Sequence, residues 1–306
     1  MNAALSSVNN GTIVRLPTAA MVRAYFALLS RLLPTLARRQ AERWFTRPPR
    51  YAGRRSHPVA ARRETVVAGR HRLAVWQAGA AAAPAVLLCH GWGGSSVQMG
   101  SFVAPLLARG FRVVWFDQPG HGESGRGQVA LPDLVAAIAA LAETHGPFEM
   151  AVGHSLGAAA IGLALRRGLS LRRVAFVSPP ASMVEHTHNF ARLLGITPRI
   201  REAMRTRLER RYGIRFADID RLDELRALKL PALFVHDTGD TVVPFEHSQR
   251  LSAHLANART IRTEGLGHFR ILRDAAVVSA VADFAAGKGD ALPEILPVLP
   301  LPAPIY

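Results

Sequence analysis

The chain has 306 residues, of which 49% are hydrophobic, enough to bury one large core. Its single cysteine, Cys89, excludes an internal disulfide framework and favours a reducing compartment. The formal net charge is +16, and +11 of it falls in residues 1–70, which hold thirteen arginines and two acids. We therefore expect a modestly charged body that carries a strongly basic N-terminal arm.

The first predicted element is a basic amphipathic helix over residues 19–45. Apolar side chains recur at helical spacing between its arginines, and Pro34 is expected to kink or divide it. The apolar stripe can pack on the body of the protein while the arginines face water, or the helix can lie on an anionic membrane surface. The apolar stripe is the same in both cases, so the sequence does not separate them. We favour packing of the helix on the body of the protein. We expect no nucleic-acid partner.

No segment is expected to span a membrane. The best candidate, residues 16–37, contains Arg23 and Arg31, which together would cost about 5–7 kcal/mol in a bilayer. A secretory signal also fits poorly, because the first ten residues hold no cation. We predict a cytoplasmic protein, with weak peripheral contact at the inner membrane face through residues 19–45 as an additional hypothesis.

Strand-like and helical runs alternate from residue 65 onward. "ETVVA" and "LAVWQA" predict a hairpin, after which short buried strands such as "AVLLCH" and "FEMAV" each precede a helical run. This alternation predicts an α/β fold, a mostly parallel sheet with helices on both faces. The active site of such a sheet lies at the carboxyl ends of its strands.

The alternation is interrupted after Pro179 by about fifty residues with mixed-charge helices, too long for a plain connection. We read this insertion as a helical lid. The predicted organisation is a basic N-terminal extension, a core in two segments, the lid between them and a proline-rich tail: residues 1–63, 64–178 with 231–287, 179–230 and 288–306.

The motif "GHSLG" at residues 153–157 places Ser155 between a predicted strand and a predicted helix. A serine in so sharp a turn is held in strained backbone with its hydroxyl exposed, and the flanking glycines avoid clashes. The first helical amide, that of Leu156, would face any group bonded to the serine. A purely structural serine in a glycine-rich turn is the alternative.

A serine nucleophile needs a histidine base and a carboxylate that orients it. His268 in "EGLGHF" follows the last predicted strand, where two glycines free its loop to reach over the sheet. The preceding strand-end loop, "HDTGDTVVP", offers Asp237 and Asp240. We favour Asp240, because Asp237 ends the strand and can instead bond to loop amides.

The glycine-rich loop "HGWGG" after the first long buried strand lets a backbone amide face the nucleophile. Trp92 N–H and Leu156 N–H are the expected oxyanion hole. The loop "DQPGHGES" is expected to be structural, with Asp117 and His121 holding neighbouring turns.

These five motifs follow one another along the chain as "HGWGG", "DQPGHGES", "GHSLG", "HDTGDTVVP" and "EGLGHF". In this order they resemble the α/β-hydrolase superfamily, in its bacterial serine esterase and lipase-like group, over residues 65–286. The resemblance implies the fold and a Ser155–His268–Asp240 triad, but not the substrate, because the family includes carboxylesterases, lipases, thioesterases and perhydrolases. We therefore expect a carboxylic ester hydrolase that acts on a small-molecule ester with an apolar acyl group, with no metal and no organic cofactor. A thioesterase or acyltransferase with the same triad is the alternative, and a non-catalytic binding or membrane-surface module is the alternative from another class.

Overall fold

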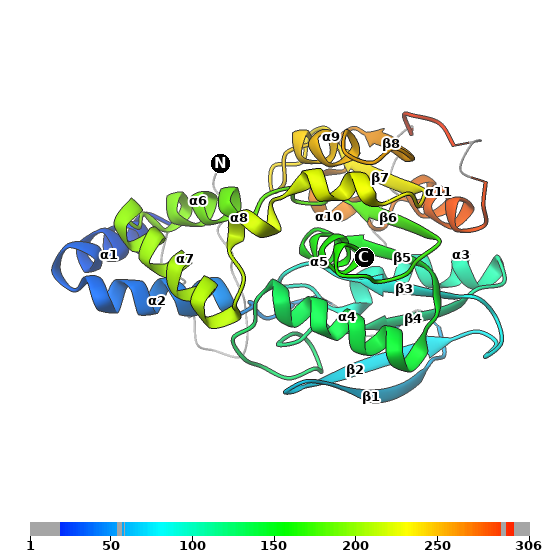
Figure 1. Ribbon diagram of the computed structural model, residues 1–306, viewed down its shortest axis with the longest axis horizontal. Coiled ribbons are helices and arrows are strands. Elements are labelled where there is room, and N and C mark those ends of the chain that lie inside the picture. The colour runs from blue at the N-terminus through cyan, green and yellow to red at the C-terminus, as the bar shows by residue number, and fades with distance from the viewer. Residues whose placement is uncertain (1–18, 54–56, 58, 289–291, 297–306) are drawn as a thin grey trace, which may run out of the picture. The chain divides into compact units, whose positions relative to one another are not determined.

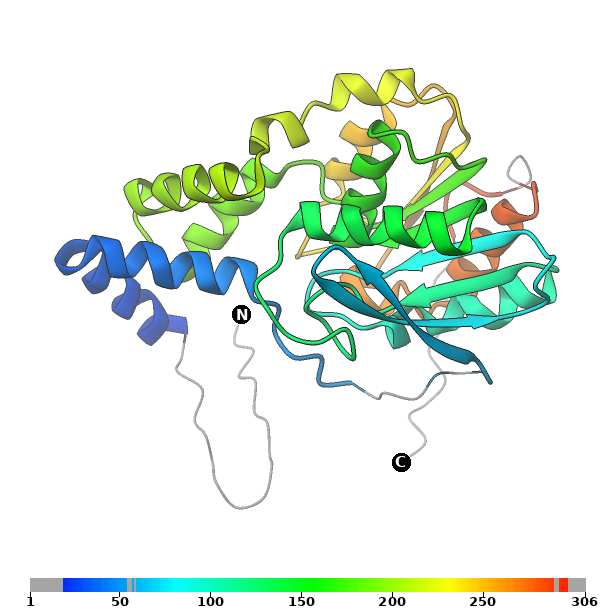
Figure 2. The ribbon, with the colours of Figure 1, turned by 60° about the horizontal axis from the view of Figure 1, so that its bottom comes forward.

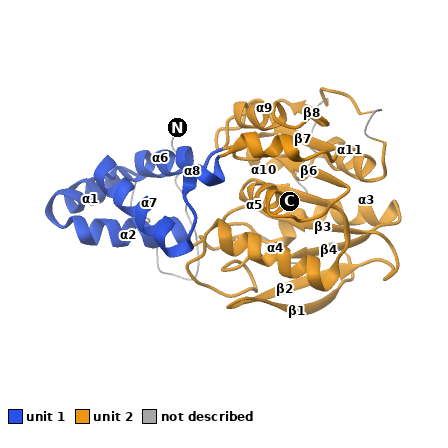
Figure 3. Ribbon diagram, viewed as in Figure 1, with its two compact units in different colours: residues 1–46, 182–220 blue, residues 47–181, 221–306 orange. Residues whose placement is uncertain are grey.

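The computed structural model describes residues 19–53, 57, 59–288 and 292–296. The outer ends of the predicted extension and tail, residues 1–18 and 297–306, lie outside this range. The chain divides into two compact units (Figure 3): unit 1 is residues 1–46 with 182–220, and unit 2 is residues 47–181 with 221–306. The N-terminal helices thus group with most of the predicted lid; the domain boundaries given above remain a prediction.

Unit 2 is built on one sheet of eight strands in the order β1-β2-β4-β3-β5-β6-β7-β8 (Figures 1 and 2). The pairs β1–β2 and β2–β4 are antiparallel, and every other pair is parallel. The strands are β1 Arg62–Ala68, β2 His71–Ala78, β3 Ala85–Cys89, β4 Arg112–Phe116, β5 Phe148–His154, β6 Arg173–Val177, β7 Ala232–Asp237 and β8 Ala258–Thr263.

Helices cover both faces of this sheet (Figure 1). Contacts pair α4 with α5 and α3 with α11. Because β3 and β7 are covered on both faces, they are buried along their whole length and read as continuous apolar runs. The helical elements of unit 2 are η1 Ser96–Phe102, α3 Val103–Ala108, α4 Leu131–His145, α5 Leu156–Arg166, η2 Leu222–Ala227, α9 Glu246–Ser252, α10 Gly267–Arg270 and α11 Ala275–Ala285. The predicted α/β fold is confirmed.

The chain reverses its direction across the sheet between β3 and β5. After β3 it forms β4 on one side, and β5 is then added on the other side of β3. Loops that leave β3 and β5 therefore diverge and open a crevice at the carboxyl ends of these strands, the usual place for a ligand in an open α/β sheet. Trp92 follows β3 and Ser155 follows β5.

Unit 1 is a group of helices that comes from two distant parts of the chain. Its elements are α1 Ala19–Leu32, α2 Pro34–Thr46, α6 Met183–Leu194, α7 Pro198–Tyr212 and α8 Phe216–Ile219. Pro34 divides the predicted helix as expected, and it is tolerated at the first position of α2 because a helix leaves its first N–H groups unbonded. Helix α1 packs on α2 and α6, and α2 packs on α7.

Two further features complete the described chain. Residues 292–296 of the predicted tail lie along β8, where Leu296 N–H donates to Arg262 O at 3.0 Å and Arg262 N–H donates to Glu294 O at 2.8 Å.

Helices among the described residues fall short, in length or in apolar character, of what a bilayer span requires.

Candidate active site

Ser155 occupies the turn between β5 and α5 with φ 50° and ψ −123°, a region that residues other than glycine rarely adopt. Its N–H is held by Val177 O at 2.9 Å. A Cβ on Gly153 would lie 2.6 Å from Ala158 Cα, and a Cβ on Gly157 would lie 2.5 Å from His90 O. The predicted strained turn is therefore confirmed, and both flanking glycines are needed for the close approach of helix α5 and the β3 loop.

His268 lies in the short helix α10 after β8 and is 5% exposed. The residue before the serine connects it to the turn: His154 Nε2–H donates to His268 O at 2.9 Å. The two imidazole rings lie 4.7 Å apart. The loop that carries His268 is thus fastened to the end of β5, one residue from Ser155.

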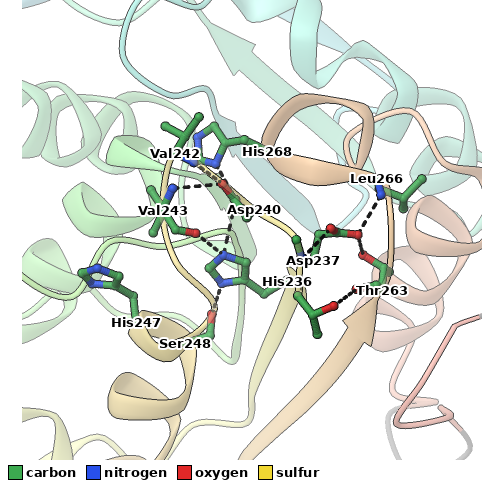
Figure 4. Close-up of polar contacts among 12 residues, drawn as sticks. His236, Asp237, Asp240, Val242, Val243, His247, Ser248, Thr263, Leu266 and His268 are labelled. Carbon is green, nitrogen blue, oxygen red and sulfur yellow. Dashed lines mark hydrogen bonds and ion pairs between the residues drawn. The ribbon is translucent and has the colours of Figure 1, made fainter. Parts of the chain in front are cut away.

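Asp240 is the carboxylate that meets His268. His268 Nδ1–H donates to Asp240 Oδ2 at 2.7 Å, while Oδ1 accepts the N–H groups of Val242 at 2.8 Å and Val243 at 2.9 Å (Figure 4). A proton on Nδ1 leaves Nε2 as the acceptor nitrogen, which is the tautomer that a general base requires.

The environment keeps Asp240 ionised. Burial alone would raise the pKa of this carboxyl group, but contacts with His236 and His268 and with the Val243 N–H outweigh burial and hold the pKa well below its usual range. An ionised carboxylate next to His268 stabilises the imidazolium that forms when the ring takes a proton.

Asp237, the other carboxylate of the same loop, has different partners. Its Oδ2 accepts from Thr263 Oγ1–H and Leu266 N–H, both at 2.8 Å, and its Oδ1 accepts from Gly239 N–H at 3.0 Å (Figure 4). Asp237 therefore ties the end of β7 to the base of the loop that carries His268. The geometry pairs His268 with Asp240, the aspartate favoured above.

His236, which no prediction above included, is completely buried next to Asp240. Its Nε2–H donates to Val243 O at 2.9 Å and lies 3.4 Å from Asp240 Oδ2, and its Nδ1 accepts from Ser248 Oγ–H at 2.7 Å. The sequence pattern could have indicated this residue. A histidine at the end of the apolar run in "ALFVHD" is expected to be buried and to need polar partners.

The loop that carries Trp92 passes directly beside the turn. A Cβ on Gly91 would lie 2.9 Å from Ser155 Cβ. Trp92 N–H and Leu156 N–H donate to no acceptor within the part of the chain that the structure describes. Two backbone donors without a protein acceptor, beside a serine at a helix N-terminus, form an arrangement that can hold an anionic oxygen.

A network of buried groups holds this loop. Gly93 N–H donates to His121 Nε2 at 3.0 Å, Ser96 N–H donates to Asp117 Oδ1 at 2.7 Å, and Gln118 N–H donates to His90 Nε2 at 2.9 Å. The structural role predicted for Asp117 and His121 is confirmed. Burial is the main cause that lowers the pKa of His121 to about 3, so its Nε2 stays available as an acceptor at neutral pH.

A model of the alpha/beta hydrolase family matches residues 86–281, and the chain belongs to this family. Trp92, Ser155, Asp240 and His268 all lie inside the matched region. Among curated proteins, the chain is similar to a non-heme haloperoxidase from Rhodococcus erythropolis, with 27% identity over 244 residues, which are 64% of this chain and 89% of that protein.

Solved structures share the fold at lower identity. An esterase of Pyrococcus furiosus has a TM-score of 0.59 at 20% identity and covers 78% of this chain and 97% of its own. Est1E from Butyrivibrio proteoclasticus, solved with ferulic acid, has a TM-score of 0.58 at 18% identity and covers 74% and 99%. The thioesterase domain of the curacin biosynthetic pathway has a TM-score of 0.56 at 18% identity, with the same coverage.

Proposed function

We propose that this protein is a serine hydrolase that cleaves a carboxylic ester through an acyl-enzyme intermediate. The observation that carries the proposal is the 2.7 Å hydrogen bond from His268 Nδ1 to the buried Asp240, in a loop fastened beside the strained turn of Ser155. Membership of the alpha/beta hydrolase family supports it, and esterases are among the proteins of similar fold.

In the first half-reaction, Ser155 Oγ attacks the ester carbonyl carbon while His268 Nε2 takes the hydroxyl proton. Asp240 holds the ring in the required tautomer and stabilises its positive charge. The tetrahedral oxyanion accepts from Trp92 N–H and Leu156 N–H, and each such donor contributes about 3–4 kcal/mol in comparable sites. The imidazolium then gives its proton to the leaving alcohol oxygen, which departs as the acyl-serine forms.

In the second half-reaction, His268 takes a proton from a water molecule as its oxygen attacks the acyl carbon. The same two amides hold the second oxyanion. Collapse breaks the bond to Ser155 Oγ, which regains the proton from His268, and the carboxylic acid leaves. Every step uses groups of the chain and water. A thioester would follow the same route with a thiol as leaving group, and the likeness to a thioesterase domain keeps this substrate class as the alternative.

A second function has its own support in the similarity to a non-heme haloperoxidase. If hydrogen peroxide replaces water in the second half-reaction, the acyl group leaves Ser155 as a peroxy acid. The peroxy acid then transfers one oxygen atom to a halide ion, which is oxidised to hypohalite while the peroxy acid is reduced to the carboxylic acid. Bromination of a dicarbonyl dye by the protein with acetate, peroxide and bromide, absent in Ser155→Ala, would support this activity.

A fluorophosphonate probe tests the proposed nucleophile without knowledge of the substrate. We expect the probe to label Ser155 in the wild-type protein, as read by peptide mass spectrometry, because only an activated serine attacks it. Ser155→Ala and His268→Ala should each lose labelling and ester hydrolysis while they remain folded. The double variant should be little worse than either single one, because the two residues act as a unit. Turnover of esters by Ser155→Ala at a substantial rate would refute the assignment.

A substrate panel then assigns the class of ester. Chromogenic esters of graded acyl length, tested beside acyl-CoA thioesters, separate a carboxylesterase from a thioesterase by kcat/KM. We propose an apolar acyl group and a cytoplasmic location; the second rests on the single cysteine, Cys89, which is a buried thiol of β3. Cell fractionation tests the location.

A further inference from the structure

Helix α1 carries a row of exposed apolar side chains. Met21, Tyr25, Leu28 and Leu32 recur at helical spacing on one face, and Leu33 and Leu36 are also exposed where α1 gives way to α2. We call these six residues the apolar ridge. Each is between 45% and 67% exposed, whereas Phe26 and Leu29, which are α1 residues outside this row, are buried within unit 1.

The apolar ridge is unusual for this protein. Twelve large apolar side chains are exposed among the described residues, and eight of them lie in unit 1, the smaller unit. Leu28 and Leu32, at the centre of the ridge, are 60% and 67% exposed. Contiguous exposed apolar side chains of this kind mark a surface for a partner or a membrane.

The charge beside the ridge has one sign only. Glu42 is the sole carboxylate of residues 19–46, and it is 7% exposed and forms ion pairs with three arginines, Arg38, Arg207 and Arg211. The same stretch exposes four more arginines: Arg23, Arg31, Arg39 and Arg43. The surface of residues 19–46 therefore offers cations and apolar groups with no exposed negative charge.

We propose that unit 1 docks on an anionic lipid bilayer through the apolar ridge. A helix face that combines exposed apolar residues with surrounding arginines lies in the interfacial layer of a membrane, apolar side down, while the arginines attract anionic headgroups. Tyr25 and the exposed Trp44 have the amphipathic rings that favour this layer. A helix face is convex, and a fluid bilayer moulds to it without the preformed groove that a protein partner would have to supply. This docking is independent of the proposed ester chemistry.

The test is co-sedimentation of the full chain, as Ser155→Ala so that no lipid is cleaved, with vesicles of phosphatidylcholine alone or mixed with phosphatidylglycerol. Binding is expected on the mixed vesicles, with a strong decrease at about 0.5 M salt. The double variant Leu28→Glu/Leu32→Glu should lower the partition coefficient by about 100-fold, since each lost leucine accounts for tenfold or more. Val67→Glu is the matched control, because Val67 is equally exposed on β1 of unit 2; its binding should be unchanged.

The electrostatic part has its own pair of variants. Arg31→Glu/Arg39→Glu should abolish the preference for anionic vesicles, while Arg72→Glu, an exposed arginine of β2, should leave it intact. Point substitutions are preferable to deletion of residues 1–50, because α1 and α2 supply buried side chains to unit 1.

Four results would overturn the proposal. The first is no binding to anionic vesicles at low salt, and the second is equal binding by the Leu28/Leu32 variant. The third is a lower melting temperature of that variant without lipid, which would mean that the ridge packs on the rest of the chain. The fourth is a wild-type dimer that the same variant converts to a monomer, which would mean that a second copy covers the ridge.

Discussion

Replacement of Asp240 by asparagine changes the protonation of His268 with almost no change in shape. Asp240 Oδ1 accepts the N–H groups of Val242 and Val243, at 2.8 and 2.9 Å, and Oδ2 accepts His268 Nδ1–H at 2.7 Å. His236 Nε2 also lies near Oδ2, but at 3.4 Å, and its proton is donated to Val243 O at 2.9 Å. We expect the asparagine carbonyl oxygen to replace Oδ1, where it accepts both N–H groups. In the opposite orientation the NH₂ group would face two N–H donors, whereas in this orientation it faces only one close donor. The side-chain NH₂ then faces His268 Nδ1.

An NH₂ group at that position forces the wrong tautomer. His268 Nδ1 must become an acceptor, so the proton moves to Nε2, which then cannot take the proton of Ser155. In a triad of this geometry we expect kcat to fall by about 10⁴-fold, equivalent to about 5.5 kcal/mol in activation free energy. The assay is kcat on a chromogenic ester, beside the rate of fluorophosphonate labelling and the melting temperature of the variant.

Asp237→Asn is the matched control, because it makes the same chemical change three residues away. An asparagine oxygen in place of Oδ2 keeps the bonds from Thr263 and Leu266 and loses only that from Gly239. We expect a loss of about 1–3 kcal/mol in the free energy of unfolding and a much smaller loss of kcat. A loss of kcat in Asp237→Asn that equals or exceeds that of Asp240→Asn would refute the reasoning, as would an Asp240→Asn variant with about a tenth or more of wild-type activity.

Three more predictions concern the scaffold of the site. His121→Ala removes the acceptor of Gly93 N–H, so the loop that carries Trp92 is no longer fixed at that point. In steady-state assays kcat should fall by up to about 100-fold, because the Trp92 N–H is then less well placed for the oxyanion. An unchanged kcat would contradict this. Gly157→Ala would place a Cβ 2.5 Å from a backbone oxygen and should prevent folding. Gly162→Ala, in the same helix, adds a Cβ in open space and should raise the free energy of unfolding, measured by urea titration, by about 0.5–1 kcal/mol. Burial lowers the pKa of His154 and of His121 to about 3. Between pH 6.5 and 3 the unfolded chain therefore binds protons at these two residues that the native state does not. Acidification over this range should lower the free energy of unfolding by about 1.4 kcal/mol per pH unit for each histidine. His121→Gln should remove one of these two contributions from the measured slope, and an unaltered slope would contradict the assignment.

Local patterns in the sequence were sufficient for the framework of unit 2. The alternation of buried strands and amphipathic helices predicted the mostly parallel sheet, and "GHSLG" predicted the strained turn at Ser155. These inferences succeed because both depend mainly on neighbours in the chain: strand burial is a matter of residue type over a few positions, and Gly153 is needed where the backbone of Ala158 approaches. Only the close approach of His90 to Gly157 is a tertiary contact.

The partners of the two aspartates depended on tertiary structure. Asp237 and Asp240 lie in one loop and share one chemistry, so the sequence could favour Asp240 only on its position relative to the strand end. The partners that tell them apart, Thr263 for Asp237 and His268 for Asp240, come from β8 and the loop after it, more than twenty residues later in the chain. The contact of His236 with Asp240, only four residues apart, was missed for a different reason: a strand pattern predicts burial but does not say which groups face each other.

Which side chains of the N-terminal helices are buried likewise depended on tertiary structure. Helical spacing in residues 19–45 showed that α1 has an apolar face, but the same pattern fits a face in a core and a face open to a partner. Helices α6 and α7, from a segment more than 130 residues away, pack on α1 and α2, and in the folded chain Phe26 and Ala41 are buried while Leu28 and Leu32 are exposed. Periodicity is a property of the helix itself, whereas burial is a property of what packs against it, and only the folded chain determines that.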